Sequence, residues 1–396
     1  MNTLSLSARA ELLKPSPTLS ITAKANQMKA DGLDVVSLAA GEPDFSTPEP
    51  ICKAAIQAIE QGFTRYTPSS GTKDLKEAIA GKLERENNLA YKPDQIVVSC
   101  GAKHSVYNAL QVLVNPGDEV ILLAPYWMTY AEQVILAGGT PVQIATEAEN
   151  DFVPSYDQLK EAISPKTKVL ILNAPGNPTG AILPRENLKQ IAALAIRHGF
   201  WVVADEIYER LVYDGFKQDS IASLGRDIMD QTVTIGGCSK SYAMTGWRIG
   251  FAAAPVPVAK AMANLQDQVT SNPTSFAQKG ATAAFNLPPD AIEAMRAEFE
   301  ARRNLIVGLL RDIEGVNVRK PGGAFYVFPD VSAFLGPDMP SDIQLAEHLL
   351  EEAQVATVPG SVFMGKGHLR LSYAASRHDI ERGVARIADV LGKRRQ

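Results

Sequence analysis

Residues Thr232 to Gly250 read T-V-T-I-G-G-C-S-K-S-Y-A-M-T-G-W-R-I-G. The first four of them, through Ile235, are mostly β-branched and predict a short buried strand, which two glycines end. Lys240 follows just past the carboxyl end of that strand, and Arg248 comes eight residues later. Ligands of open α/β sheets bind in the crevice beyond the carboxyl ends of the strands. The pattern therefore places two cations where a ligand is expected.

The chemistry of these two cations narrows the kind of ligand. A lysine held among apolar and small residues can lose its proton and become an amine nucleophile that forms a Schiff base with a carbonyl. Arg248 stays charged at any working pH, and its planar guanidinium suits phosphate. Together they favour pyridoxal phosphate (PLP), an aldehyde that carries a phosphate. Most lysines are solvated, so Lys240 by itself also fits an ordinary loop, and the other strands must decide.

Short apolar strands alternate with helical patterns through the middle of the chain. This alternation predicts an α/β fold with a mostly parallel sheet covered by helices on both faces. Seven strands are expected in the sheet: Ile96–Ser99, Glu119–Leu123, Pro141–Ile144, Lys168–Leu172, Trp201–Ala204, Thr232–Ile235 and Ile249–Ala253. A helical run is expected from Ser105, and a long amphipathic helix over Asp290–Glu314 leaves the sheet.

The C-terminal segment has a different pattern, in which a few strands lie among helices. Strands are expected at Ala324–Phe328, Ala356–Val358 and His368–Tyr373, with helices at Ser341–Ala353 and Arg377–Leu391. Such a segment predicts a smaller α+β domain. We expect residues 46–289 to form the large domain, and residues 1–45 with 290–396 to form the small one.

Composition excludes several classes of function. The chain has 396 residues, of which 45% are hydrophobic and 21% are charged, and its net charge is −5, as in an ordinary soluble protein large enough for two domains. The one basic run is Lys393 to Arg395, so no nucleic-acid partner is expected. Three scattered cysteines imply no disulfide framework, and no Cys/His cluster has metal spacing. No run reads as a signal peptide or is long enough to span a membrane, which favours a cytoplasmic protein, although a removed presequence would leave no trace.

Chemically distinctive residues follow five of the expected strands. After Ile96–Ser99, Gly101 and Ala102 leave a helix N-terminus open, and backbone N–H groups there can hold phosphate. The residues after the next strands are Trp127, Asn177, Asp205 with Tyr208, and Lys240. Each residue alone has an ordinary explanation, such as a helix cap, a turn or core packing. Five coincidences at successive strand ends would be needed to explain them all in that way.

These residue types match the needs of PLP. A buried carboxylate, here Asp205, raises the pKa of the pyridine nitrogen and keeps the ring an electron acceptor. Asn177 and Tyr208 can donate to the ring oxygen beside the aldehyde, and Trp127 gives the ring a face on which to stack. The strand ends therefore predict a PLP site.

Several motifs extend this interpretation along the whole chain. They are A-G-E-P-D-F, R-Y-T-P-S-S-G, N-P-T-G, D-E-I-Y, S-K-S-Y-A-M-T-G-W-R-I-G and L-R-L-S-Y. Their set resembles the class I aminotransferases of PLP fold type I, and especially the bacterial branch of aspartate and prephenate aminotransferases that begins with an L-K-P-S motif. The match from Lys240 to Gly250 is the most specific.

The resemblance implies roles for individual residues. Lys240 would be the Schiff-base lysine, with Arg248 and Ser239 as phosphate ligands beside Gly101, Ala102 and Lys103. Arg370 would bind the substrate α-carboxylate, Gly41 would offer its backbone, and Trp127 and Asn177 would also contact the substrate. Tyr66 would reach the phosphate of a neighbouring subunit, which implies a homodimer with shared sites. The alternation in H-L-R-L-S-Y equally suits a solvated arginine, so the role of Arg370 depends on the resemblance.

Substrate choice depends on fewer residues. In this branch, a lysine at the position of Lys103 is associated with the distal carboxylate of the substrate, and Lys14 matches a lysine linked to prephenate. Lys103 could instead pair with the phosphate or with a surface acid. Gly237 departs from relatives that carry a hydroxyl three residues before the lysine, so one phosphate contact is either missing or supplied by Ser239.

The resulting hypothesis is a PLP-dependent aspartate aminotransferase that exchanges an amino group between L-aspartate and 2-oxoglutarate by a ping-pong mechanism. Prephenate or aromatic transamination and β-elimination are alternatives on the same scaffold. A PLP-fold regulator that binds ligand without turnover is the non-enzymatic alternative, but such proteins usually add a DNA-binding domain and none fits here.

Overall fold

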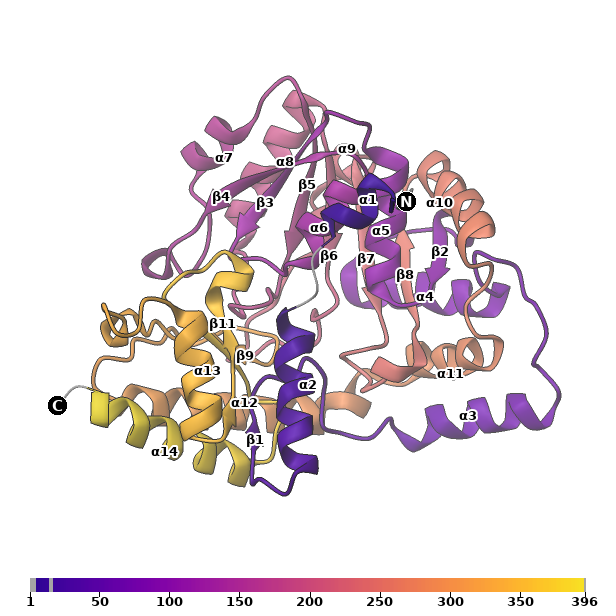
Figure 1. Cartoon of the computed structure of the whole chain (residues 1–396). Helices are drawn as coiled ribbons and strands as arrows, with labels where there is room; N and C mark the ends of the chain where they lie inside the picture. Colours follow the sequence, from indigo (N-terminus) through magenta and orange to yellow (C-terminus); the bar gives the residue numbers. More distant parts are fainter. Residues whose placement is uncertain (1–4, 14–16, 395–396) are drawn as a thin grey trace.

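The computed structural model describes residues 5–13 and 17–394. Within these residues the largest sheet has the seven strands that the sequence predicts (Figure 1). Their order in the sheet is β2-β8-β7-β6-β5-β3-β4. The strands are β2 (Ile96–Ser99), β3 (Glu119–Ala124), β4 (Thr140–Ala145), β5 (Thr167–Asn173), β6 (Trp201–Asp205), β7 (Thr232–Gly237) and β8 (Gly250–Ala253). Neighbouring strands are parallel except that β8 runs antiparallel to both β2 and β7.

Helices cover the sheet on both faces because its central strands are apolar on both sides. On β5, Val169 and Ile171 pack in one core with helix α5 (Ala102–Leu113). Leu170 and Leu172 pack in another core with helix α8 (Arg185–His198). All four side chains are buried, as expected for strands with two covered faces. The helices before and within this region are α3 (Glu49–Glu60), α4 (Lys73–Asn87), α5 (Ala102–Leu113), α6 (Thr129–Leu136), α7 (Tyr156–Ala162), α8 (Arg185–His198), α9 (Arg226–Met229), α10 (Val256–Val269) and α11 (Ser275–Asn286).

The reversed strand β8 decides which residues share an edge of the sheet. Because β2 and β7 both pair antiparallel with β8, they run in the same direction as each other. The carboxyl ends of β2, β3, β5, β6 and β7 therefore meet at one edge, and the first residue of β8, Gly250, lies there beside Ser99 and Gly237. A Cβ at Gly250 would lie 2.2 Å from the Ala102 nitrogen, so this close approach requires glycine.

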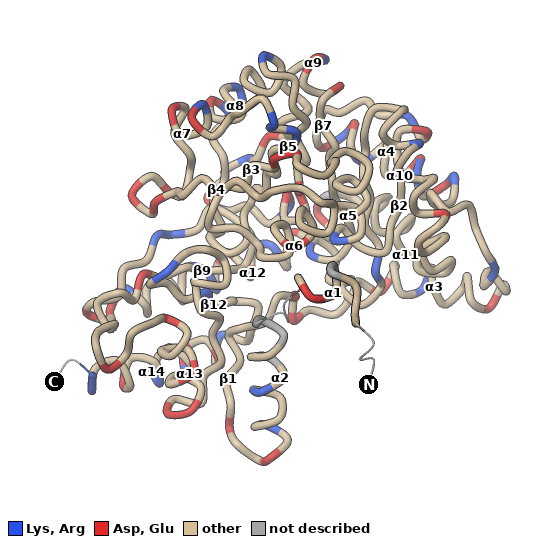
Figure 2. Tube along the Cα trace, turned by 45° about the horizontal axis from the view of Figure 1, so that its top comes forward, with Lys and Arg blue, Asp and Glu red and all other residues tan. Residues whose placement is uncertain are grey.

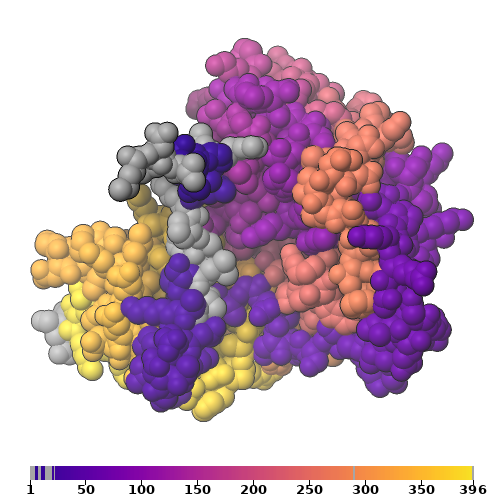
Figure 3. Space-filling view, turned by 45° about the vertical axis from the view of Figure 1, so that its right-hand side comes forward, coloured from indigo at the N-terminus to yellow at the C-terminus, as the bar shows by residue number. Residues whose placement is uncertain are grey.

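The described residues also form two smaller sheets, built mainly by the C-terminal part of the chain. In the first, β1 (Val36–Ser37) pairs parallel with β10 (Val355–Ala356). In the second, β12 (Leu369–Ser372) lies between β11 (Val358–Pro359) and β9 (Tyr326–Val327) and is antiparallel to both. The N-terminal helix α2 (Pro17–Ala30) also packs against residues of the C-terminal part, as Figure 3 shows. The remaining helices are α1 (Ala8–Leu12), α2 (Pro17–Ala30), α12 (Glu293–Arg311), α13 (Asp342–Glu352) and α14 (Arg377–Arg394). The domain division at residues 45/46 and 289/290 stays a prediction.

Three expected elements differ from the structure. The helix after β2 begins at Ala102 and not at Ser105, because Gly101 adopts a positive φ of 88° and leads directly into it. The helix expected over Asp290–Glu314 starts as a 3₁₀ turn, η5 (Pro289–Ile292), and α12 ends at Arg311. The strand expected over Ala356–Val358 is two strands in two different sheets, because β10 pairs with β1 whereas β11 pairs with β12.

Charged residues of both signs are interspersed along the chain (Figure 2). Among the described residues, every helix is too short or too polar to cross a bilayer. His, Cys, Asp and Glu side chains in the same part of the chain form no group of three that could hold a metal ion.

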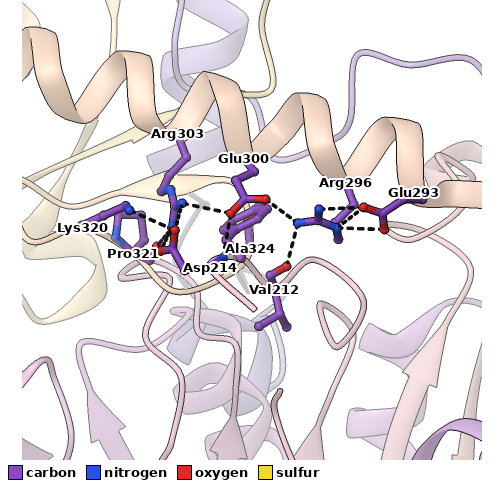
Figure 4. A network of polar contacts seen from close by, with 10 residues as sticks. Val212, Asp214, Glu293, Arg296, Glu300, Arg303, Lys320, Pro321 and Ala324 are labelled. Carbon is purple, nitrogen blue, oxygen red and sulfur yellow. Dashed lines mark hydrogen bonds and ion pairs between the residues drawn. The ribbon is translucent and has the colours of Figure 1, made fainter. Parts of the chain in front are cut away.

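One face of α12 binds the segment that follows β6 through an ionic network around the buried Arg303 (Figure 4). Arg303, whose side chain is fully buried, donates to the two carboxylate oxygens of Asp214 at 2.8 and 2.9 Å and to the Pro321 carbonyl at 2.9 Å. Glu300 accepts from the Asp214 backbone N–H at 2.7 Å and pairs with Arg296 at 2.7 Å. This network fastens α12 to the Val212–Asp214 segment.

Replacing Asp214 by asparagine tests that attachment. Asp214→Asn should lower the free energy of unfolding by about 1–3 kcal/mol, because the buried Arg303 charge loses its anionic partner. Asp151→Asn is the matched control, since Asp151 lies 4.0 Å from Arg319 in an exposed pair and such pairs contribute little. Urea unfolding curves of both variants measure the difference, and equal stabilities would contradict a structural role for the Asp214 pair.

Candidate active site

A cavity of about 620 Å³ lies at the carboxyl edge of the large sheet. Most of the residues that the sequence predicts for a site line it: Gly41, Ala102, Lys103, Trp127, Asn177, Asp205, Tyr208, Ser239, Lys240, Arg248 and Arg370. Gly101 directly precedes α5 beside them. Tyr66 is 91% exposed and is not part of the lining, and Lys14 lies outside the described residues.

Lys240 follows β7 and reaches the cavity, where its Nζ donates a hydrogen bond to the Gly41 carbonyl. Burial lowers the pKa of Lys240 from its ordinary value to about 8. The Arg370 and Arg248 charges lower this pKa as well, whereas the Glu42 and Asp205 carboxylates raise it. An amine with a pKa near 8 is neutral in a sizeable fraction of molecules near pH 7, as a nucleophile or general base must be.

Asp205 is the last residue of β6 and is 2% exposed. Its carboxylate accepts hydrogen bonds from the Tyr130 hydroxyl at 2.8 Å and from the Ile207 backbone N–H at 3.2 Å. Burial raises the pKa of Asp205 to about 6, against these two hydrogen bonds and the Lys240 charge, which lower it. A cation bound beside this carboxylate would favour its ionised form, so Asp205 suits a protonated ring nitrogen.

Arg370 on β12 is 2% exposed and is held by hydrogen bonds to neutral oxygens. Its guanidinium donates to the Asn177 side-chain oxygen at 3.1 Å and to the Ala39 carbonyl at 2.8 Å, and it lies 4.5 Å from the Tyr326 ring centroid. Its Nε has no partner among the described residues. A buried guanidinium whose partners are uncharged retains its full charge for an anionic ligand in the cavity.

The start of α5 and Arg248 form a cradle of donors. Arg248 has a left-handed backbone, with φ 56°, and its guanidinium donates to the carbonyls of Thr245 at 2.9 Å and Cys100 at 3.3 Å. A Cβ at Gly101 would lie 2.5 Å from Arg248 Nη2, so glycine allows the guanidinium to approach the helix N-terminus. Free N–H groups at a helix start and an arginine fork are a donor set that suits phosphate.

The glycine at 237 has a structural reason. It is the last residue of β7, and a Cβ there would lie 2.9 Å from the Ile249 carbonyl and 3.0 Å from Gly250 Cα. The neighbouring strand β8 thus occupies the space that a hydroxyl-bearing side chain would need. Ser239, which is buried and lines the cavity, is in a position to supply a hydroxyl instead.

Lys103 lies above the aromatic plate expected from the sequence. Its Nζ is 4.7 Å from the Trp127 ring centroid, and Trp127 meets Tyr130 edge to face at 5.3 Å. Burial, and then the Arg248 charge, lowers the pKa of Lys103. Lys103 lines the same cavity as Lys240 and Arg370, at an exposed position of α5.

The sequence interpretation missed residues that complete the cavity. Tyr130 donates to Asp205, and it could have been found because it lies three residues past Trp127, at helical spacing at the start of α6. Tyr326 shares a hydrogen bond of 3.0 Å with Tyr208. It lies in the strand expected over Ala324–Phe328, but that pattern did not show that its side chain lines the cavity. Glu42 also lines the cavity and accepts from the Thr245 hydroxyl at 2.7 Å.

Comparison with known proteins gives this arrangement a family. Residues 33–387 match the family model for aminotransferase class I and II. The chain is 49% identical over 383 residues to the aspartate aminotransferase of Bacillus sp. (strain YM-2), covering 96% of this chain and 98% of the relative. It is 43% identical over 391 residues to the aspartate/prephenate aminotransferase of Thermus thermophilus, covering 98% and 99%.

Solved structures agree. The fold matches the structure titled aspartate aminotransferase from Thermus thermophilus with maleate at a TM-score of 0.94 and 42% identity, covering 98% of this chain and 100% of that one. The chain belongs to the class I and II aminotransferases. It is a PLP transaminase of the aspartate aminotransferase type.

The residues present fit PLP, the cofactor that this family implies. A phosphate-sized cradle joins α5 to Arg248, and the space at Gly101 is closed to any side chain. Lys240 supplies an amine of lowered pKa, and Asp205 supplies a buried carboxyl group in the same cavity. Phosphate, aldehyde and ring nitrogen thus each have a residue of matching chemistry.

The lowered pKa of Lys240 can be measured without cofactor. Labelling of the cofactor-free protein with an amine-reactive reagent should rise at Lys240 with pH and reach half of its maximum near pH 8, because the neutral amine reacts. In Glu42→Gln the half-point should move to lower pH, since the Glu42 carboxylate favours the charged amine. Peptide mass spectrometry resolves the labelled site. A Lys240 profile still rising above pH 10, as for an ordinary lysine, would contradict the assignment.

Proposed function

We propose that the chain is an aspartate aminotransferase that transfers an amino group between L-aspartate and 2-oxoglutarate by a ping-pong mechanism. One observation carries the proposal: besides Arg248, which is assigned to the phosphate, the cavity that contains Lys240 contains two further cations from different elements, Arg370 on β12 and Lys103 on α5. Two separated cations around a nucleophilic amine suit a small substrate with two carboxylates.

Arg370 is proposed to bind the carboxylate next to the reacting carbon. Asn177 and the Ala39 carbonyl hold its guanidinium on one side, so the remaining N–H groups are oriented before the substrate arrives. Such preorganisation reduces the entropy lost on binding and fixes the reacting carbon near Lys240.

Lys240 is proposed to move the proton. When bound, PLP supplies an electron sink that makes the α-proton of an amino acid acidic. The Lys240 amine, with a pKa near 8, takes that proton as a base and returns it as an acid. Asp205 holds the charge on the ring nitrogen, and Tyr208, whose pKa burial raises well above its ordinary value, stays a hydroxyl donor.

Lys103 is proposed to bind the distal carboxylate, and Trp127 to stack on the cofactor ring. The ammonium of Lys103 lies over the Trp127 ring face and lines the cavity, so a carboxylate there would gain a charged hydrogen bond in a partly desolvated place. Ser239, Arg248, Gly101 and Ala102 would hold the cofactor phosphate.

We also propose that the active unit is a cytoplasmic homodimer. Tyr66 is 91% exposed although it is large and aromatic, and it does not line the cavity of its own chain. A second copy offers a partner for such a side chain, which would then reach the neighbour's phosphate.

Prephenate is the alternative acceptor for which the comparisons give a reason, because relatives at similar identity are named for either activity. Lys14, which the resemblance links to prephenate, lies outside the described residues. Absorbance spectra of the purified protein with aspartate, glutamate, prephenate and tyrosine separate the possibilities.

The parent protein should change its cofactor absorbance on addition of aspartate or glutamate, and Lys240→Ala should show no detectable turnover. Turnover should be lost in this variant because the Lys240 amine is the group proposed to move the α-proton. Asp205→Ala should bind the cofactor and lose orders of magnitude in rate. Normal transamination by Lys240→Ala would show that the proposed mechanism is wrong.

Lys103→Ala should raise the KM for aspartate by about tenfold or more relative to that for alanine, because a charged hydrogen bond to the distal carboxylate is worth roughly 1.5–3 kcal/mol. Lys53→Ala is the control, since Lys53 pairs with Glu49 on the exposed face of α3. Steady-state kinetics with both amino acids measure the ratio, and an equal effect on both would leave Lys103 without a role in specificity.

A further inference from the structure

The loop from Ala39 to Asp44 contacts both cations on which the proposed reaction depends. The Ala39 carbonyl accepts a hydrogen bond from Arg370 Nη2 at 2.8 Å, and the Gly41 carbonyl accepts one from Lys240 Nζ. Backbone carbonyls can orient these groups only if the loop itself is held in place. What holds the loop therefore bears on how well the cavity is organised.

One side of the loop is fastened to the segment that carries Lys240 and Arg248. The Thr245 hydroxyl donates to Glu42 at 2.7 Å, and the Thr47 hydroxyl donates to the Ala243 carbonyl at 2.7 Å. Trp247 donates from its indole nitrogen to the same Thr47 hydroxyl at 3.1 Å. These bonds fix the loop relative to Lys240. Just before the loop, the Ser372 backbone N–H on β12 donates to the Leu38 carbonyl at 2.7 Å, so its first end is held to the strand that carries Arg370.

The other side of the loop is fastened to α12 by Asp44. Arg302 Nη1 donates to the two carboxylate oxygens of Asp44 at 2.7 and 2.9 Å, and only 9% of the Arg302 side chain is exposed. Its guanidinium lies 5.0 Å from the ring centroid of Phe45, which in turn meets Phe299 edge to face at 5.2 Å. An ion pair whose arginine is buried and backed by aromatic rings has a defined geometry.

A second acidic residue connects Arg302 to the helix that follows the Arg370 strand. Glu298, one turn before Arg302 on α12, accepts from Arg302 Nε at 2.8 Å and from Arg377 at 3.0 and 2.6 Å. Arg377 is the first residue of α14, which follows β12 and its Arg370. The hydrogen bond from Arg377, and then that from Arg302, lowers the pKa of Glu298 to about 2, so the chain of charges stays intact near neutral pH.

We infer that Asp44 and Arg302 are positioning residues that set the Ala39–Gly41 backbone against Arg370 and thereby set the affinity for the substrate carboxylate. The inference rests on the proposed role of Arg370. Neither residue touches the substrate; both act through the Ala39 carbonyl. Loss of the ion pair should leave the loop held at Leu38 and at the Lys240 segment but free at its Asp44 end. Arg370 would then keep Asn177, while its Ala39 partner would be held less firmly.

Binding of succinate, a dicarboxylate that has no amino or keto group to react, tests the inference directly. Calorimetry of the PLP-loaded protein should give a Kd about tenfold higher for Asp44→Asn than for the parent protein. The change keeps the shape of the side chain and removes its charge. The double variant Asp44→Asn/Arg302→Gln should bind no more weakly than Arg302→Gln alone, because Arg302→Gln already breaks the contact that Asp44→Asn removes. The KM for aspartate should rise similarly, with kcat within about threefold of the parent value.

Asp214→Asn is the matched control (Figure 4). It makes the same substitution in a carboxylate held bidentately by the neighbouring residue of the same helix, Arg303, but Asp214 lies in the segment after β6 and not beside the Ala39–Gly41 loop. It should lose stability and keep the succinate Kd of the parent protein. An unchanged Kd in Asp44→Asn, or an equal rise in both variants, would overturn the inference.

Arg370→Lys separates the inference from the proposal beneath it. If Arg370→Lys binds succinate as well as the parent protein does, the proposed carboxylate role fails, and the inference fails with it. If Arg370→Lys loses succinate while Asp44→Asn retains it, the proposed function stands and the positioning role alone is wrong.

Discussion

An acid and a base share one buried cavity here without neutralising each other. Lys240 donates to the Gly41 carbonyl, whereas Asp205 accepts from Tyr130 and the Ile207 backbone. A direct ion pair would have held both groups in their charged forms. Because their partners are neutral, burial moves the pKa of Lys240 down to about 8 and that of Asp205 up to about 6. Each group is thereby left free for a ligand.

The sheet provides this arrangement through the direction of its strands. Residues far apart in sequence meet because five carboxyl ends lie at one edge, and the sequence predicted that edge from the residues after each strand. What the sequence could not show was the reversal of β8. Apolar strands buried on both faces have the same pattern in either direction. The sequence placed Arg248 near Lys240 by spacing alone, and the pairing of Gly250 with Ser99 and Gly237 shows why it lies at the same edge.

The C-terminal half of the site was harder to predict for a related reason. The sequence predicted strands at Ala324–Phe328 and Ala356–Val358, but so short a pattern does not show which strands pair, and β10 and β11 adjoin in sequence yet pair in different sheets. Tyr326, which bonds to Tyr208 and stacks against Arg370, was therefore missed. Arg370 itself lies in an alternating strand pattern that suits solvent equally well, but β12 is covered on both sides, which makes Arg370 one of the most buried charges in the described chain.

Helix α12 holds two separate segments in place, the loop that contains Asp44 and the segment that contains Asp214. Successive arginines on it point to different neighbours: Arg302 binds the loop before the site, and Arg303 binds the segment after β6. Neighbouring residues on a helix are about 100° apart, so one helix can hold two loops on two of its faces. The burial of an arginine on a helix depends on the segments that pack against it, which the sequence pattern does not show. Arg302 and Arg303 therefore looked like ordinary residues of the solvent-exposed face of an amphipathic helix. The residues that carry the chemistry were visible as motifs, and those that hold them apart at the right distance became visible only in three dimensions.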